Sequence, residues 1–98
     1  MKTLFDVMDK LEENGYSVEY DDFITWLDIE SENSHVSMKP TISSDEYDNE
    51  DVESFIIPDF ANGSTNEMDI YLENYPKRET IQKPNAIDLY NTIVEWLR

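Results

Sequence analysis

Both ends of the chain carry apolar residues at helical spacing. Near the amino terminus the spacing i, i+3, i+4, i+7 is filled by apolar side chains, namely Leu4, Val7, Met8 and Leu11. Thr3 and Asp6 form a capping-box pattern before this stripe, and Asn14-Gly15 follows it as a stop signal. Near the carboxyl terminus Asn85 is a candidate N-cap for a second stripe, made up of Ala86, Ile87, Tyr90, Ile93, Val94 and Leu97. The pattern predicts one helix at each end.

Between these ends, apolar and polar residues alternate with the period of two that is typical of strands. Four stretches show it, at residues 16–20, 23–29, 36–42 and 68–72. Residues 55–58 are a fifth, short candidate, in which Pro58 favours a sheet edge or a strand end. The polar segment 30–35 has the length of a hairpin loop, so the second and third strands are expected to pair antiparallel.

The remaining segments are polar and are expected to connect these elements. They are an acidic loop at 43–53, a turn at 61–66 and a connection with two prolines at 75–84. The order of the elements predicts an α+β fold, a small two-layer domain with an N-terminal helix, an antiparallel sheet of three to five strands and a C-terminal helix. At 98 residues the chain is expected to form one domain, residues 1–98, with the helices on one face of the sheet.

Strand alternation also predicts which side chains face away from the core. If Phe23, Thr25, Leu27 and Ile29 point inward, the opposite face receives Ile24, Trp26, Asp28 and Glu30. In the same way, Met68, Ile70 and Leu72 would be opposed by Asp69, Tyr71, Glu73 and Tyr75. Two interpretations are open. The aromatic residues stabilise cross-strand pairs on a half-solvated face, or they form the centre of a binding surface.

The net charge of the chain and its distribution indicate more about function than any motif does. The chain has 23 Asp or Glu against 7 Lys or Arg, a net charge of -16. Residues 1–10 and 77–98 are nearly neutral, whereas residues 11–76 hold 18 acids and one base, Lys39. Such a single acidic domain is not expected to bind DNA, RNA or an anionic membrane directly, because those surfaces require a basic patch. Its partner should be basic.

Cysteine is absent, so disulfides and Cys-ligated metal sites are not possible. Asp6 interrupts the amino-terminal apolar residues before a signal-peptide core could form, and no run approaches the roughly 20 apolar residues of a membrane span. We therefore expect a cytoplasmic protein, in the cytoplasm of the host cell if a phage encodes it.

The sequence offers little catalytic chemistry. His35 is the only histidine and is expected to lie in solvent beside the hairpin loop rather than to act as a base. Glycine occurs only at positions 15 and 63, which is too few for a phosphate-binding loop. The segment 45–51 has the composition of a calcium loop but lacks its central glycine and ligand spacing. No catalytic residue, cofactor or metal site is expected, and the protein is not expected to be an enzyme.

The leading hypothesis is therefore a non-catalytic inhibitor that mimics nucleic acid and blocks the DNA- or RNA-binding cleft of a basic partner. Residues 11–76, with 18 acids and one base, have a net charge of -17. B-DNA carries about one negative charge per 1.7 Å of its axis, so 17 charges correspond to roughly 29 Å of duplex. Candidate partners are a CRISPR effector, a restriction enzyme or another nuclease. Small phage proteins that block such enzymes work in this general way. The chain shares no motif with them, so they serve only as an analogy for the class of function.

The partner-binding residues expected from this hypothesis are the acids of the first hairpin and of the acidic loop, with three aromatic residues that could stack or wedge where bases would. They are Glu19, Asp21, Asp22, Trp26, Asp28, Glu30, Glu32, Asp45, Glu46, Tyr47, Asp48, Glu50, Asp51, Glu53 and Tyr71. If the second strand extends far enough, Asp28, Glu30 and Glu32 form a row at about 6.6 Å spacing.

The alternative is an immunity protein or antitoxin that neutralises one cationic nuclease toxin. There, acidity steers association while a few buried anchors such as Trp26 provide specificity. A third possibility is an adaptor or regulatory domain whose acidity only keeps it soluble. The chain is expected to be a monomer or, if the strip of Ile24 and Trp26 is buried against a second copy, a homodimer.

Overall fold

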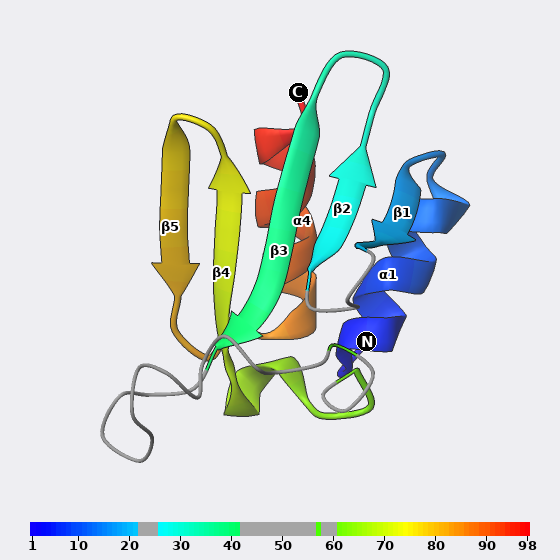
Figure 1. Ribbon diagram of the computed structural model, residues 1–98. Helices are drawn as coiled ribbons and strands as arrows, with labels where there is room; N and C mark the ends of the chain where they lie inside the picture. The colour runs from blue at the N-terminus through cyan, green and yellow to red at the C-terminus, as the bar shows by residue number, and fades with distance from the viewer. Residues whose placement is uncertain (22–25, 42–56, 58–60) are drawn as a thin grey trace.

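The computed structural model of the protein describes residues 1–21, 26–41, 57 and 61–98 (Figure 1). Within these described residues the elements follow in the order α1 (Leu4–Glu13), β1 (Ser17–Tyr20), β2 (Leu27–Glu30), β3 (His35–Thr41), the short 3-10 helix η1 (Thr65–Glu67), β4 (Asp69–Asn74), β5 (Lys77–Ile81) and α4 (Ala86–Trp96). No helix among these described residues is long and apolar enough to cross a membrane.

The five strands form one antiparallel sheet in the order β1-β2-β3-β4-β5, so each strand pairs with its neighbours in the sequence. Both α-helices lie on the same face of this sheet, behind it in the view of Figure 1. The predicted α+β fold, with a helix at each end of a two-layer domain, is confirmed. The opposite face of the sheet carries no helix among the described residues, and we call it the outer face.

The start and the end of α1 follow the sequence signals. The Thr3 hydroxyl accepts the backbone N–H of Asp6 at 3.1 Å, while the Asp6 carboxylate accepts the backbone N–H of Thr3 at 3.1 Å and that of Lys2 at 2.9 Å. These bonds satisfy donors that a helix start leaves unpaired. The helix ends at Asn14, after which Gly15 takes a positive φ of 89° that favours glycine.

The C-terminal helix begins where expected, because the Asn85 side chain accepts the Asp88 backbone N–H at 2.8 Å. Its predicted inward stripe was partly wrong. Ala86, Ile93 and Leu97 are buried as predicted, but Ile87 is 49% exposed, and Leu89 and Trp96, which the stripe did not include, are buried. The helix is apolar around much of its circumference, so periodicity alone admits two stripes, and packing against the sheet selects one of them.

Strands β2 to β4 confirm the predicted alternation in the parts that the structure describes. In β1 it holds only in part, because Val18 is half-buried but Tyr20, on the same side of the strand, is 41% exposed. Leu27, Ile29, Val36, Met38, Ile70 and Leu72 are fully buried on the inner face. The strand expected at 23–29 is described only from Leu27 to Glu30, since residues 22–25 lie outside the described residues. The pairing of β2 with β3 as an antiparallel hairpin is also confirmed.

One expectation for the connecting segments was wrong, and one expected strand lies almost entirely outside the described residues. The connection at 75–84 contains strand β5, which pairs with β4 from Ile70↔Ile81 to Asn74↔Lys77. Its first four residues are exposed, so this edge strand is defined by its main-chain pairing with β4 and shows no alternation of buried and exposed residues. Of the strand expected at 55–58, only Ile57 is described. Ile57 itself is helical rather than extended, and its carbonyl accepts the Ala61 N–H at 2.9 Å.

A single apolar core lies between the inner face of the sheet and the two helices. Its fully buried members come from both layers and from the segment that precedes η1, and include Leu4, Val7, Leu11, Leu27, Ile29, Val36, Met38, Ile57, Ala61, Ile70, Leu72, Leu89 and Ile93. Because the core lies entirely on this side, the side chains of the outer face contribute little to it.

The end of α4 is fastened to the hairpin side of the sheet by polar side chains. The Asn74 amide donates to the carbonyl of Trp96 and to the Ser34 hydroxyl, both at 3.1 Å. The hydroxyl of Ser31 donates to the carbonyl of Leu97 at 3.1 Å, and that of Ser34 to Trp96 at 3.4 Å. The last carbonyls of a helix have no intrahelical donor, so these side chains supply the hydrogen bonds that the helix itself cannot make.

Candidate functional site

The outer face of the sheet gathers the charged and aromatic side chains that the sequence predicted to point away from the core. Strand pairing places Glu19 opposite Asp28, Asp28 opposite Ser37, Ser37 opposite Glu73, and Glu73 opposite Arg78. Directly opposed residues share a face and have Cβ atoms about 5 Å apart. One row of side chains therefore crosses all five strands, and three of its five members are acids.

A second row runs beside the first and contains the aromatic residues. Leu27 pairs with Met38, so the preceding Trp26 lies beside Lys39, and Lys39 is directly opposite Tyr71. The rings of Trp26 and Tyr71 meet edge to face with centroids 5.7 Å apart, and the Lys39 ammonium lies 4.6 Å from the centroid of the Trp26 ring. Lys39, the lone base of residues 11–76, is thus held on the outer face over an aromatic ring.

Tyr71 connects the aromatic row to the acidic row. Its hydroxyl donates to Glu73 Oε2 at 3.2 Å. Burial raises the pKa of Tyr71, and the hydrogen bond and charge of Glu73 raise it further, whereas nearby Arg78 lowers it. The phenol therefore stays protonated at neutral pH and keeps one oxygen of Glu73 in place.

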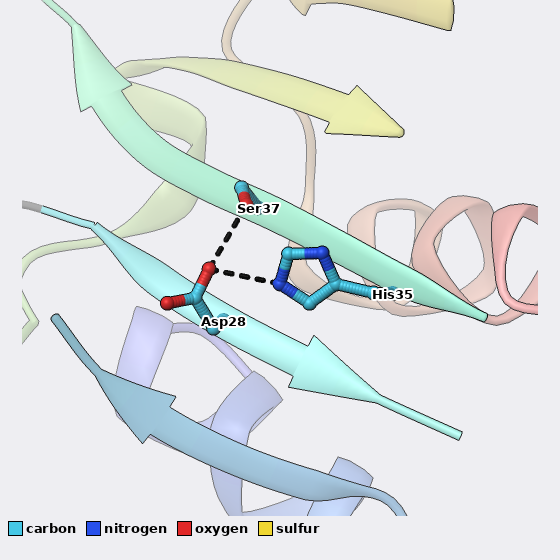
Figure 2. A network of polar contacts seen from close by, with 3 residues as sticks. All are labelled: Asp28, His35 and Ser37. Carbon is cyan, nitrogen blue, oxygen red and sulfur yellow. Dashed lines mark hydrogen bonds and ion pairs between the residues drawn. The ribbon is translucent and has the colours of Figure 1, made fainter. Parts of the chain in front are cut away.

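Asp28 is the centre of a polar network on the first row (Figure 2). Its Oδ1 accepts the Ser37 hydroxyl at 2.9 Å and contacts His35 Nε2 at 3.0 Å. The His35 side chain is half exposed, and that of Asp28 is about one third exposed. His35 thus flanks the hairpin at the surface, as predicted from its position.

The same three residue types make up a hydrolytic triad, but their order differs here. In a triad the imidazole lies between the hydroxyl and the carboxylate, so that it can take the proton of the nucleophile. Here the hydroxyl of Ser37 and the ring of His35 both bond to the same oxygen of Asp28 (Figure 2). The carboxylate is therefore the hub, and the Ser37 proton points to Asp28, which makes the network suited to fixing a charge rather than to activating a nucleophile.

A shallow open depression of about 320 Å³ lies in the outer face where the two rows meet. It is lined by three acidic residues, one tryptophan and one serine, namely Asp21, Asp28, Glu73, Trp26 and Ser37. The backbone N–H of Asp21 donates to the carbonyl of Trp26 at 3.2 Å, which brings the end of β1 to this depression. Within the part of the chain that the structure describes, no group of three or more His, Asp or Glu side chains is arranged to hold a metal ion.

The structure brings some of the predicted partner-binding residues together and separates others. Glu19, Asp21, Trp26, Asp28, Glu30 and Tyr71 lie on or beside the outer face. Strand β2 ends at Glu30, so the condition set for a row from Asp28 to Glu32 is not met, and Glu32 lies beyond the strand. Outside the described residues lie Asp22, Ile24, Asp45, Glu46, Tyr47, Asp48, Glu50, Asp51 and Glu53.

Several residues that complete this site were not among the predicted partner-binding residues. Ser37, Lys39, Glu73 and Arg78 all lie on the outer face, yet only Glu73 had been assigned to it. The alternation of β3 contained the signal for Ser37 and Lys39, because they are the residues between the buried Val36, Met38 and Pro40. Arg78 gave no such signal, since β5 does not alternate.

Comparison of the chain with protein-family models, with curated proteins and with solved structures found no match in any of the three.

Proposed function

We propose that the protein is a non-catalytic inhibitor that mimics nucleic acid and occupies the DNA- or RNA-binding cleft of a basic partner. The partner would be a nuclease such as a CRISPR effector or a restriction enzyme, met in the cytoplasm of the cell. The observation that carries the proposal is the outer face, where Glu19, Asp28 and Glu73 lie in one row across the sheet beside the exposed carboxylate of Glu30. Acids held on paired strands present fixed negative charge, as a phosphate backbone does.

The scale of the molecule supports the same function. The protein carries a net charge of -16 and measures 37 × 28 × 22 Å. A B-DNA segment with 16 charges is about 27 Å long, at about 1.7 Å per charge. A cleft that accommodates about one turn of duplex could therefore hold this protein. The anions bound in such a cationic cleft would be released when the carboxylates of the protein bind, as they are when DNA binds.

One observation favours the alternative, an immunity protein that neutralises a single cationic nuclease toxin. Trp26 is held in one orientation by Tyr71 and Lys39. A large aromatic side chain that is fixed before binding loses little entropy on association, which is the behaviour of a specific anchor. The two functions differ in how binding energy is distributed. A mimic spreads it over many carboxylates, whereas an immunity protein concentrates it in one or two anchors.

The test begins with affinity capture by the tagged protein from nuclease-treated lysates of candidate host cells, and continues with the captured partner in purified form. Duplex DNA or guide RNA should displace the partner from the protein. The dissociation constant is then compared for two triple variants that each remove three negative charges. One changes the outer face, Glu19→Gln, Asp28→Asn and Glu73→Gln. The other changes three exposed acids of α1, Asp9→Asn, Glu12→Gln and Glu13→Gln.

The outer-face triple variant should weaken binding about tenfold or more, since each lost charge contact contributes roughly 0.5 kcal/mol or more. The α1 variant should change it much less, because its charges lie on the helical side. Equal loss in both variants, or a partner that nucleic acid does not displace, contradicts mimicry by this face. If Trp26→Ala alone abolishes binding while the outer-face triple variant has little effect, the immunity protein is the better description.

A further inference from the structure

We propose that the depression in the outer face receives the guanidinium group of an arginine from the partner. This inference deepens the proposed function, on which it rests for the presence of a basic partner, and it specifies which side chain of that partner is bound and where. The depression is lined by Asp21, Trp26, Asp28, Ser37 and Glu73. A lining that combines an aromatic residue with acidic residues matches the chemistry of arginine, which is planar, always charged and able to stack on a ring.

The aromatic wall already binds a cation of the chain itself. The Lys39 ammonium lies 4.6 Å from the centroid of the Trp26 ring, and the rings of Trp26 and Tyr71 form a T-shaped pair with centroids 5.7 Å apart. Neither Lys39 nor Tyr71 is among the residues that line the depression. The ring is therefore kept in place by neighbours that leave the depression open, and its electron-rich face attracts positive charge.

The carboxylates of the depression are held by hydrogen bonds within the protein. Asp28 accepts Ser37 and His35 through one oxygen, Oδ1, and Glu73 accepts the Tyr71 hydroxyl through Oε2. Each acid therefore presents a second oxygen that takes no part in these bonds. Because both side chains are already ordered, they lose little rotational entropy when a cation binds, unlike flexible surface acids.

The arrangement should favour arginine over lysine. Asp28 and Glu73 lie on either side of Ser37 in the first row, and all three residues line the depression. A guanidinium has five donors spread in a plane and can bond to both acids while it stacks on Trp26, whereas an ammonium is a compact point charge with strong hydration. Nucleic-acid-binding clefts use arginine to hold phosphates, so such a residue is available in a partner of this class.

The experiment uses the intact isolated protein and two small probes, N-acetyl-arginine amide and N-acetyl-lysine amide, at equal ionic strength. Titration is followed by NMR at the indole N–H signals of the two tryptophans. Trp26 lines the depression, whereas Trp96 is 7% exposed at the end of α4, beside Lys77, and serves as an internal control. The variant Glu73→Gln removes one wall charge, and Glu12→Gln on α1 is the matched control for loss of a charge elsewhere.

The arginine probe should shift the Trp26 signal saturably and leave Trp96 unchanged, with binding about threefold or more tighter than that of the lysine probe. Glu73→Gln should weaken it about three- to fivefold, and Glu12→Gln by less than twofold, if the contacts have the strength of ordered surface ion pairs. Equal binding of both probes, or equal loss in both variants, would overturn the arginine site. The titration needs no partner, so failure of nucleic-acid mimicry in the capture experiment and failure of this site are distinguishable.

Discussion

Asn74 at the end of β4 offers the most direct measure of how the sheet and α4 are fastened together. Its amide nitrogen donates to the carbonyl of Trp96 and to the hydroxyl of Ser34, each at 3.1 Å. The Ser34 hydroxyl in turn donates to the same Trp96 carbonyl at 3.4 Å. Three elements meet in this cluster, the β2–β3 turn, the end of β4 and the last turn of α4.

The change Asn74→Ala removes two hydrogen bonds from a half-buried position. Each bond contributes about 0.5 to 1.5 kcal/mol net, which gives about 1 to 3 kcal/mol for the pair. The Trp96 carbonyl keeps its weaker bond from Ser34, so the full cost of an unsatisfied acceptor is not reached. We expect a loss of about 1 to 2 kcal/mol in the free energy of unfolding, equivalent to a fall in Tm of about 4 to 16 °C in a domain of this size.

Urea unfolding followed by circular dichroism at 222 nm measures this loss for Asn74→Ala, Ser34→Ala and the double variant. The two residues share one bond, so the double variant should cost about 0.5 to 1 kcal/mol less than the two single costs combined. Ser17→Ala on the exposed edge of β1 is the control and should change stability by less than about 0.5 kcal/mol. Additive costs, or a loss below about 0.3 kcal/mol for Asn74→Ala, would refute this account of how α4 is held.

Two further predictions concern the helices. Leu89→Ala should lower the unfolding free energy by about 2 to 5 kcal/mol, because Leu89 is fully buried. Ile87→Ala should lower it by less than about 1 kcal/mol, because Ile87 is 49% exposed. Urea unfolding of both variants measures the two losses, and losses of similar size would support the inward Ile87 that was predicted from the sequence. In α1, hydrogen bonds from the backbone N–H groups of Lys2 and Thr3 lower the pKa of Asp6 below its ordinary value of 3.8. The ionised carboxylate therefore stabilises the fold at pH values above 3.8, and this stabilisation is lost as the pH falls through the lowered pKa. The Tm difference between the native protein and Asp6→Asn should accordingly be largest near neutral pH and vanish in strong acid, with Asp9→Asn on the same helix as the control, and a difference independent of pH would contradict it.

Local sequence signals predicted most of the fold. The capping pair of Thr3 and Asp6, the glycine at position 15 and the N-cap Asn85 act within a few residues, so their effect is visible in the sequence and recurs in the structure. Alternation in β3 and β4 is equally local, because a strand with one buried face must alternate. Strand β5 escaped prediction, since an exposed edge strand is held by main-chain bonds to a neighbour and needs no apolar face.

The sequence by itself determined which residues of the strands point to the outer face, and therefore which residue types that face contains. Trp26, Asp28, Tyr71 and Glu73 were assigned to it from periodicity, since a side chain between two core positions has nowhere else to point. The acidic charge of the chain, and with it the expectation of a basic partner, also follows from the sequence, because charge is additive and does not depend on the fold.

Only the tertiary structure decided which of these residues meet. Register places Asp28 beside Ser37 and Ser37 beside Glu73, although the two acids are 45 positions apart in the chain. It also decided that His35 and Ser37 bond to one Asp28 oxygen, that Lys39 covers Trp26, and that α4 turns Leu89 rather than Ile87 inward. Strand pairing and helix rotation are chosen by the packing of the whole core, and no local pattern contains that information.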